Sequence, residues 1–367
     1  MATDAGYPAE LARYSRQMLY ERVGVEGQKR LSHASAVLVG CGALGSVLAN
    51  TLVRAGIGSL RIIDRDFIEP NNLQRQVLFD EHDIAQNLPK AEAAARKLRK
   101  INSGVEIEGL VTDVNPGSVE DLCTDADLIL DGTDNLETRF LLNDVAVKHE
   151  LPWVYGACLG AEGLVLPIVP HRTPCLRCIW DEPPLPGTVP TCDTVGVLAA
   201  AAQVVASLQA TEAMKILMGR AAEVSRHLLA VDVWMGRIRA VHVQAALDDG
   251  ECPCCKQGRY DFLTGRRAAA TTTLCGRDAV QITPGEGDAA AERRSDEGKS
   301  ESRVGRVDFK RLADRLPART SPKFNEFLLR FSVDNYAVTL FADGRAIIQG
   351  TSDPAVARGV YAKYVGT

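Results

Sequence analysis

The sequence predicts an α/β fold: a Rossmann-like, doubly wound, mostly parallel sheet, followed by a small α+β domain at the C-terminus. Two observations predict the main fold. Short apolar runs alternate with longer helical runs from Ala36 to about Leu130, and this alternation is typical of parallel sheets with helices on both faces. In addition, a glycine-rich turn joins the first apolar run to the first helical run, as in dinucleotide-binding folds.

Length, charge and cysteine content limit the function classes. The 367 residues are enough for a large domain and a smaller one, and the net charge of −5 argues against a general nucleic-acid binder. No apolar run reaches the roughly 18 residues of a membrane helix, and the N-terminus lacks a signal-peptide pattern. We therefore expect a cytoplasmic protein with no membrane and no nucleic-acid partner. Its ten cysteines then favour metal binding or catalysis over disulfides.

The main domain is predicted over residues 1–264. After a helical lead-in at 10–34, we expect strands at 36–39, 60–63, 105–111 and 127–131 and helices at 43–55, 90–100 and 135–149. Strands at 152–158 and 163–169 follow, and then a proline-rich crossover that cannot be regular structure. A very apolar helix at 195–218, suited to a core or a dimer interface, and strands at 227–233 and 237–243 complete the domain.

The C-terminal part differs in composition. Residues 265–303 are polar and charged, which predicts a flexible linker. Residues 304–367 then show the patterns of a helix, a meander with Asp-Asn and Asp-Gly turns, and a closing helix. Together these patterns predict a small α+β domain, whose role the sequence does not indicate.

The glycines of "GCGALG" form the first candidate site. Gly40 permits the tight turn after the strand, Gly42 lets the backbone approach a phosphate, and Gly45 lets the helix pack close to the strand. The N-terminus of the following helix favours an anion. Asp64 ends the second strand about 20 residues further on, where an acidic side chain binds a ribose hydroxyl. This pattern by itself favours a hydride-transfer enzyme, with a fold that binds no nucleotide as the alternative.

The residues after Asp64 weaken the hydride-transfer interpretation. The segments "EPNNLQRQ" and "LPKAEAA" supply Asn72, Arg75, Gln76 and Lys90 as candidate nucleotide contacts. A triphosphate that is being cleaved needs cations to offset the charge on the moving phosphates, whereas a pyrophosphate held by backbone amides needs few. Arg75 and Lys90 are each equally compatible with a solvated surface charge.

A third motif, "DGTDN", follows the fourth strand over residues 131–135. A carboxylate at this edge of a parallel sheet faces the ligand crevice, so that Asp134 is a candidate magnesium ligand and Asn135 a candidate nucleotide contact. The alternative for Asp134 is a cap on the following helix, and both roles are compatible.

Two pairs of cysteines have the spacing of zinc knuckles. "CLRC" supplies Cys175 and Cys178, and "CPCC" supplies Cys252 and Cys255. Four thiolates form a closed, tetrahedral, structural zinc site. Spacing favours Cys255 over Cys254 as the fourth ligand, and a redox dithiol or unrelated thiols are the alternatives.

Cys192 lies in the proline-rich crossover, just before the apolar helix. A nearby helix N-terminus lowers the pKa of a thiol, and a loop suits a group that moves between two steps. Cys192 is therefore a candidate nucleophile, with a buried spectator as the alternative.

Together, these motifs resemble the MoeB/ThiF/HesA family, prokaryotic relatives of ubiquitin-activating enzymes. The resemblance covers about Arg13 to Cys255 and rests on "RYSRQ", "GCGALGS", "IIDRDFIEPNNLQRQ", "PKAEAA", "DGTDN", "CLRC", "TCDTVGVL" and "CPCC" in family order. It implies that the cradle binds ATP and that the enzyme adenylates the C-terminal Gly-Gly carboxylate of a ubiquitin-like sulfur-carrier protein. The implied pathway is molybdopterin, thiamine, cysteine or thiolated-tRNA synthesis, or protein conjugation.

The resemblance also implies roles for residues. Asp64 would hold the ribose, Arg75 and Lys90 the phosphates, and Asp134 a magnesium ion. The other nucleotide-site candidates, expected to orient the ligand or its loop, are Asn72, Gln76 and Asn135.

Two further roles concern partners. Arg16 of "RYSRQ" would reach the phosphates of a neighbouring subunit, which implies a homodimer, and the alternative is an ordinary surface charge. Cys192 matches the family cysteine that links to the carrier in some members and is dispensable in others. Eukaryotic relatives often end in a rhodanese domain with a reactive cysteine, but this chain has no cysteine after Cys275. The sulfur is therefore expected to come from a separate donor protein or from an already charged carrier.

Three rival functions stay open at this point. An NAD-dependent oxidoreductase would need a proton-transfer group, and the six histidines are scattered. A non-catalytic scaffold is disfavoured by Arg75, Lys90 and Asp134. A relative that adenylates another peptide or a small carboxylate is the third, and "CLRC" with "TCDTVGVL" favours the sulfur-carrier branch over it.

Overall fold

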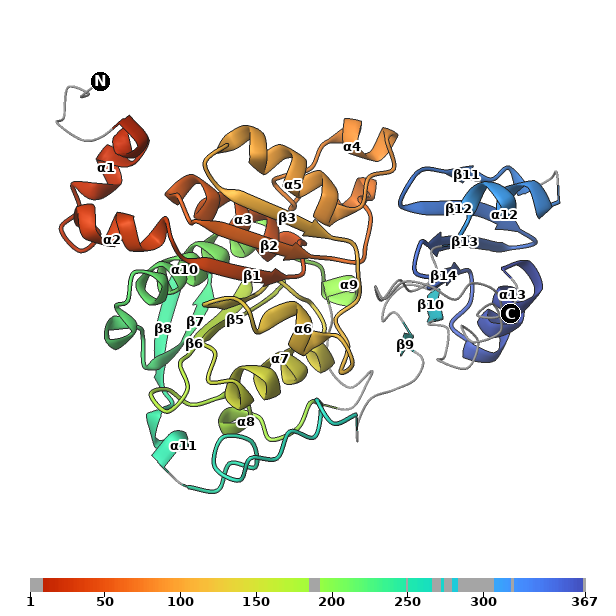
Figure 1. Ribbon diagram of the computed structural model, residues 1–367. Helices are drawn as coiled ribbons and strands as arrows, with labels where there is room; N and C mark the ends of the chain where they lie inside the picture. The colour runs from red at the N-terminus through yellow and green to blue at the C-terminus, as the bar shows by residue number, and fades with distance from the viewer. Residues whose placement is uncertain are drawn as a thin grey trace, which may run out of the picture. The chain divides into compact units, whose positions relative to one another are not determined.

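The computed structural model (Figure 1) describes residues 9–184, 192–248, 250–265, 272–273, 279–282, 307–317 and 320–365. The chain divides into two compact units, Met1–Ala268 and Ala269–Thr367. Within the described ranges, no helix combines the length and the apolar character needed to cross a bilayer.

The first unit is built on an eight-stranded sheet in the order β3-β2-β1-β4-β5-β6-β7-β8. Its strands are β1 (Ser35–Val39), β2 (Ser59–Ile63), β3 (Glu106–Leu110), β4 (Ile129–Asp131), β5 (Trp153–Leu159), β6 (Glu162–Ile168), β7 (His227–Asp232) and β8 (Arg237–His242). The strands from β3 to β5 are parallel, and β6, β7 and β8 extend the sheet by antiparallel pairing. The predicted Rossmann-like, mostly parallel sheet is confirmed.

Helices cover both faces of this sheet (Figure 1). The helices of this unit that follow β1 are α3 (Ala43–Ala55), α4 (Glu81–Ala85), α5 (Lys90–Ile101), α6 (Val119–Cys123), α7 (Leu136–Lys148), α8 (Leu176–Ile179), α9 (Cys192–Val195), α10 (Ala199–Leu217) and α11 (Gln244–Asp248). The helices α3, α5 and α10 lie on one face, and α6 and α7 pack on the other, around the buried rings of Phe140 and Trp153. This arrangement is the doubly wound one that the alternation predicted.

The apolar helix begins later than predicted. The segment 192–195 forms the separate short helix α9, and Gly196 has φ +82°, a left-handed value that ends it. Helix α10 then starts at Ala199 and packs its small side chains, such as Ala202 and Ala206, against α3, β5 and β6.

The predicted helical lead-in is divided into three pieces, η1 (Ala9–Tyr14), α1 (Ser15–Met18) and α2 (Gly24–Leu31). Gly24 has φ +57°, which interrupts the helix. The lead-in packs on the C-terminal end of α3: an ideal Cβ on Gly56 would lie 2.3 Å from the Tyr14 ring, and Gln17 Nε2 donates to the carbonyl of Ala55 at 3.0 Å.

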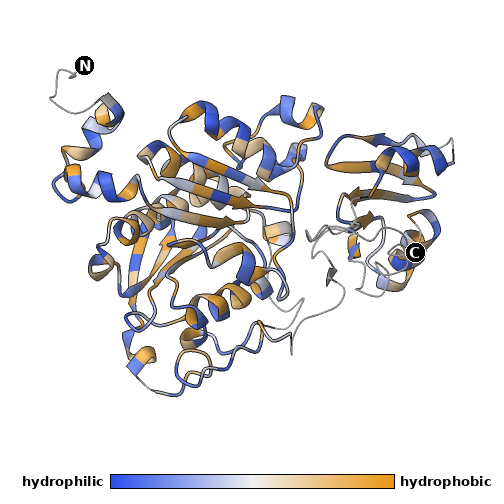
Figure 2. Cartoon of the chain, viewed as in Figure 1, coloured by the Kyte–Doolittle hydropathy of each residue, from blue (hydrophilic) through white to orange (hydrophobic). Residues whose placement is uncertain are grey.

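The second unit is a six-stranded antiparallel sheet in the order β11-β12-β13-β14-β10-β9, with helices α12 (Phe309–Arg315) and α13 (Pro354–Tyr364). Its strands are β9 (Thr272–Thr273), β10 (Ala279–Ile282), β11 (Lys323–Phe324), β12 (Leu328–Val333), β13 (Tyr336–Phe341) and β14 (Ala346–Gln349). Figure 2 shows apolar residues concentrated on the strands of both sheets. The α+β fold of this unit agrees with the prediction.

The predicted linker at 265–303 needs correction, because it contains β9 and β10. Strand β10 pairs with β14 and is buried along its whole length, so the second unit begins before residue 304. The sequence pattern does not predict β10, because its partner β14 lies more than sixty residues further along the chain. The rest of the predicted linker, apart from 265, lies outside the described residues.

Candidate active site

The glycine-rich turn after β1 contacts the end of β4 through backbone atoms, without intervening side chains. An ideal Cβ on Gly45 would lie 2.0 Å from the Gly40 carbonyl oxygen, and one on Gly132 would lie 2.1 Å from the same atom. Gly40 itself has φ +86°. These contacts leave no room for a side chain, which agrees with the predicted roles of Gly40 and Gly45. Gly132, inside "DGTDN", completes the contact, and sequence analysis missed it.

Gly42 occupies a more open position, as the N-cap of α3. The atom nearest to an ideal Cβ there is Gln76 Nε2 at 3.8 Å. The Gln76 side chain is buried, and its Oε1 has no hydrogen-bond partner in the described part of the chain. A helix N-terminus whose first residue leaves room for a Cβ, beside an unpaired buried polar atom, fits an anionic ligand such as a phosphate.

Asp64 follows β2 and lies against the same turn. Its Oδ2 accepts a hydrogen bond from the backbone N–H of Cys41 at 2.6 Å, and its Oδ1 accepts one from the N–H of Asp66 at 2.7 Å. Burial raises the pKa of the Asp64 carboxyl above its ordinary value, and the charge of Lys90 opposes this shift. A carboxylate has about four acceptor positions, so Asp64 retains capacity for a ribose hydroxyl.

Lys90 is a buried cation at the start of α5, and not a solvated surface charge. Its side chain is only 6% exposed, and Nζ lies 3.1 Å from Asp66 Oδ2. Burial by itself lowers the pKa of the Lys90 ammonium, but the charges of Asp66 and Asp64 outweigh burial and raise that pKa above its ordinary value. Lys90 therefore stays charged beside the cradle.

Arg75 and Asn72 are held by a short helix, η2 (Pro70–Asn72). Arg75 is half-buried, and its Nη1 donates to the carbonyl of Asn71 at 2.7 Å. Asn72 is fully buried, and its Oδ1 accepts from the N–H of Glu69 at 3.1 Å. The contacts of Asn72 thus shape the loop that presents Arg75 and Gln76.

In the loop after β4, the helix cap and the candidate magnesium ligand are two different residues. Asn135, and not Asp134, caps α7: its Oδ1 accepts from the N–H groups of Glu137 at 2.8 Å and Thr138 at 3.3 Å. The cap alternative for Asp134 is therefore wrong. Asp134 is exposed and makes no hydrogen bond or ion pair with any residue that the structure describes.

Three cations lie within electrostatic range of the Asp134 carboxylate. Asp134 interacts electrostatically with Lys90, Arg65 and Arg139. A carboxylate with open coordination positions has the donor chemistry that Mg²⁺ prefers.

Arg16 lies far from the cradle of its own chain. It is exposed on α1, at the C-terminal end of α3, and makes no ion pair with the described residues. Helix α3 has 13 residues and is about 20 Å long, and the cradle is at its other end. Figure 1 shows α1 and α2 beyond the amino ends of the strands, on the side opposite to the cradle.

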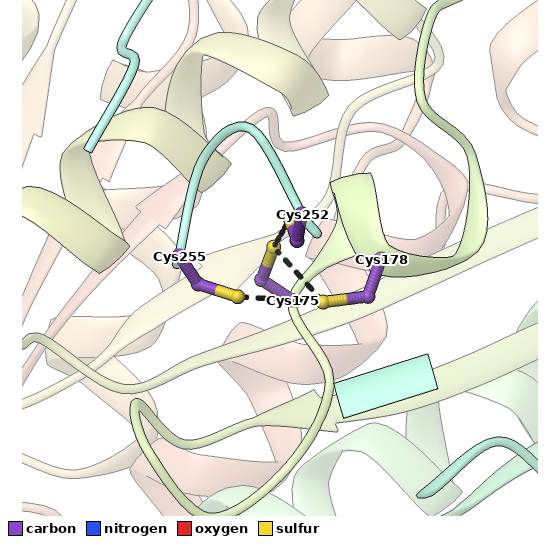
Figure 3. A group of neighbouring side chains, drawn as sticks. All are labelled: Cys175, Cys178, Cys252 and Cys255. Atoms are coloured by element: carbon purple, nitrogen blue, oxygen red, sulfur yellow. Dashed lines mark hydrogen bonds between the residues drawn. The ribbon is translucent and has the colours of Figure 1, made fainter. Parts of the chain in front are cut away.

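Four cysteines from two segments far apart in the sequence point toward one another (Figure 3). Cys175 and Cys178 come from α8 and its N-cap, Cys252 and Cys255 come from the turn after α11, and all four Sγ atoms lie within 4.8 Å of one another. Neighbouring Sγ atoms are 3.4–3.7 Å apart. Thiolates bound tetrahedrally at 2.3 Å from zinc would be about 3.8 Å apart, so the group fits a metal ion.

Cys254 lies outside this group of four. Its Sγ is 3.5 Å from Asp144 Oδ1 and accepts from Asn143 Nδ2 at 3.4 Å. The same two residues of α7 organise the cluster, because Asn143 Oδ1 accepts from the N–H of Leu176 and Asp144 Oδ2 accepts from the N–H of Phe262. The sequence showed no signal for Asn143 and Asp144, which are polar positions in a buried helix.

Cys192 begins α9 and is half-buried, with Sγ 3.4 Å from the carbonyl oxygen of Cys158 on β5. The segment returns to the β5–β6 turn, where Gly160 N–H donates to the Gly196 carbonyl at 2.8 Å. Cys192 therefore lies near the carboxyl end of β5, but not directly before α10 as predicted. Most of the preceding crossover, 185–191, lies outside the described residues.

Comparison with known proteins decides the family. The sequence model of the ThiF family matches residues 14–254. The chain belongs to the ThiF family. This result confirms the resemblance inferred from the motifs. Among curated ThiF-family relatives, the sulfur carrier protein ThiS adenylyltransferase of Bacillus subtilis is 42% identical over 355 residues, which is 96% of this chain and 99% of that protein.

Other relatives cover mainly the first unit. The sulfur carrier protein adenylyltransferase of Thermus thermophilus is 38% identical over 73% of this ThiF-family chain and 97% of that protein. The SAMP-activating enzyme E1 of Haloferax volcanii is 39% identical over 69% of this chain and 92% of that protein. Among solved structures, E. coli MccB with AMPCPP and MccA has a TM-score of 0.57 at 25% identity, covering 65% of this chain and 74% of that chain.

Proposed function

We propose that the chain is an ATP-dependent adenylyltransferase that activates the C-terminal Gly-Gly carboxylate of a ubiquitin-like sulfur-carrier protein. A carboxylate oxygen attacks the α-phosphorus of ATP, the acyl-adenylate forms, and pyrophosphate leaves. The observation that carries the proposal is the open N-terminus of α3 beside the buried cation Lys90 and the free carboxylate of Asp134. The relatives named as sulfur-carrier adenylyltransferases support the acceptor class.

The first unit supplies the nucleotide contacts. The backbone of Gly40, Gly42 and Gly45 brings N–H groups and the α3 dipole to the phosphates. Asp64 accepts the ribose hydroxyls with its remaining acceptor positions. Gln76 offers its unpaired Oε1 beside the cradle.

Charge on the moving phosphates is offset by three groups. Lys90 and Arg75 act as fixed cations, held by Asp66 and by the η2 turn that Asn72 shapes. Asp134 would hold a Mg²⁺ ion, which would supply further positive charge at the phosphates. Asn135 fixes the backbone beside that carboxylate through its cap.

The enzyme acts as a homodimer in this proposal. The distance of about 20 Å along α3 prevents Arg16 from reaching the phosphates of its own chain. Its exposed position suits it to enter the cradle of a second copy, as the resemblance implies. Exposed Leu19 and Tyr20 next to it offer apolar surface for that contact.

The remaining assignments concern metal, sulfur and location. The four-cysteine group holds a structural Zn²⁺, because four thiolates leave no open position for catalysis. The Cys192 thiolate attacks the acyl-adenylate carbonyl, AMP leaves with the electrons of the broken C–O bond, and a thioester to the carrier forms. The sulfur comes from a separate donor. A cytoplasmic location agrees with a site that needs reduced thiols.

The test is ATP–pyrophosphate exchange, with small Gly-Gly-ended proteins of the source organism supplied one at a time. We expect exchange that depends on one carrier and disappears in Asp134→Ala. Cys192→Ser is the matched control, because it should block the covalent link and leave exchange intact. Absence of exchange with every carrier, in a zinc-loaded dimer, would contradict the proposed function.

A further inference from the structure

A buried ion pair lies directly beneath the loop that carries Asp134. Asp131, the last residue of β4, is fully buried, and Arg139 of α7 is 6% exposed. Arg139 Nε donates to Asp131 Oδ2 at 3.0 Å. Removing two charges from water costs several kcal/mol per ion, and a hydrophobic pair of similar volume is often as stable. The pair therefore calls for an explanation other than stability.

The pair converges on Thr133, the residue before Asp134. Asp131 Oδ1 accepts from the Thr133 N–H at 2.9 Å and from its hydroxyl at 2.8 Å, while Arg139 Nη2 donates to the Thr133 carbonyl at 2.6 Å. Both peptide groups of Thr133 are thus bound by one ion pair. On the other side, Asn135 is bound in the α7 cap. The backbone of Asp134 is held between these two clamps while its carboxylate stays free.

The same pair ties the loop to neighbouring elements. Arg139 Nη2 also donates to the carbonyl of Gly156 on β5 at 2.9 Å. Gln209 of α10 donates to the Asp131 carbonyl at 2.9 Å. Gln209 fits only because residue 156 is glycine: an ideal Cβ there would lie 2.1 Å from the Gln209 amide carbon. The position of the loop is therefore set jointly by β4, β5, α7 and α10.

We propose that Arg139 is a positioning residue, which acts through Asp131 and Thr133 to hold the backbone of Asp134, so that the Asp134 carboxylate would be in place to bind a magnesium ion. This inference rests on the proposed function. A lysine at position 139 would keep the charge but lose the fork that binds Asp131, Thr133 and Gly156 together. A small displacement of a catalytic group is enough to lower the rate by orders of magnitude.

The experiment compares Arg139→Lys and Arg139→Met with the unmodified enzyme over a range of Mg²⁺ concentrations. We expect the Mg²⁺ concentration for half-maximal pyrophosphate exchange to rise about fivefold or more, and kcat to fall at least about tenfold, while KM for the carrier stays nearly constant. Glu212→Gln is the control, because Glu212 is also a buried member of an ion pair in the same unit, with Lys215 at 2.6 Å, and makes no described contact with the loop at Asp134. It should leave the Mg²⁺ response unchanged.

Amide hydrogen exchange of the full chain supplies a readout that does not need activity. In Arg139→Lys, the amide of Thr133, which donates to Asp131, should exchange faster, while those of α10 should not change. Normal protection of the Thr133 amide in Arg139→Lys, or a normal Mg²⁺ response in either variant, would overturn the inference. If the unmodified enzyme shows no carrier-dependent exchange, the proposed function fails, and the amide measurement still decides whether Arg139 holds the loop.

Discussion

The choice between two adjacent cysteines is the sharpest prediction about the metal site. In Cys255→Ala, the cluster loses one of its four Sγ ligands, whereas in Cys254→Ala it keeps all four. We expect the unmodified chain and Cys254→Ala to purify with one zinc per chain, and Cys255→Ala to bind zinc weakly and lose it to a chelator. Both substitutions remove the same atom from neighbouring positions of one turn, so each is the control for the other.

The size of the effect follows from the chain that the metal closes. Cys178 and Cys255 are 77 residues apart in sequence, and so are Cys175 and Cys252. By the chain-entropy relation, a cross-link that closes a loop of this length stabilises the folded state by about 4.5 kcal/mol. One kcal/mol corresponds to roughly 2–4 °C for a unit of this size. Loss of the metal should therefore lower the melting temperature by about 10–15 °C.

Metal analysis after dialysis and differential scanning calorimetry measure the two quantities. Calorimetry of Cys254→Ala should show a decrease of only a few degrees, from the lost packing beside Asp144. The assignment would be refuted if Cys254→Ala lost the zinc, or if Cys255→Ala kept it at full stoichiometry through a chelator wash.

Three further predictions separate binding from folding. Gly42→Ala should abolish ATP binding and leave the melting temperature nearly unchanged, because its Cβ would meet nothing nearer than 3.8 Å. Gly45→Ala should instead lower the free energy of unfolding by several kcal/mol, because its Cβ would lie 2.0 Å from a backbone oxygen. Calorimetry with and without ATP measures both effects. Asp134→Asn should leave stability unchanged and lower pyrophosphate exchange about a hundredfold or more, because the exposed carboxylate supports no described contact. Lys90→Met should abolish pyrophosphate exchange and lower the free energy of unfolding in urea by about 2 kcal/mol, because it removes the buried cation that pairs with Asp66. A fully active Lys90→Met enzyme would show that Lys90 does not belong to the nucleotide site.

Much of the fold and site was predictable because the signals are local. Strand and helix periodicity located every strand of the eight-stranded sheet, and the glycine spacing located the turn at Gly40. The exceptions have identifiable causes. The pattern does not distinguish β10 from a linker, because three apolar residues in a polar region carry little signal without their partner β14. The start of α10 was missed because Gly196 ends a preceding short helix.

The sequence by itself determined the α/β fold class, the glycine turn, the acids that follow β2 and β4, and the two cysteine pairs. Each of these depends on the spacing of residues within one short segment. Only the tertiary structure decided that Lys90 is buried beside carboxylates and that Asn135, and not Asp134, caps α7. It also decided that Arg139 binds the loop between β4 and α7. These features depend on contacts between elements far apart in sequence, and the free energy of such contacts depends on burial and hydrogen-bond geometry, which a linear pattern of residue types does not contain.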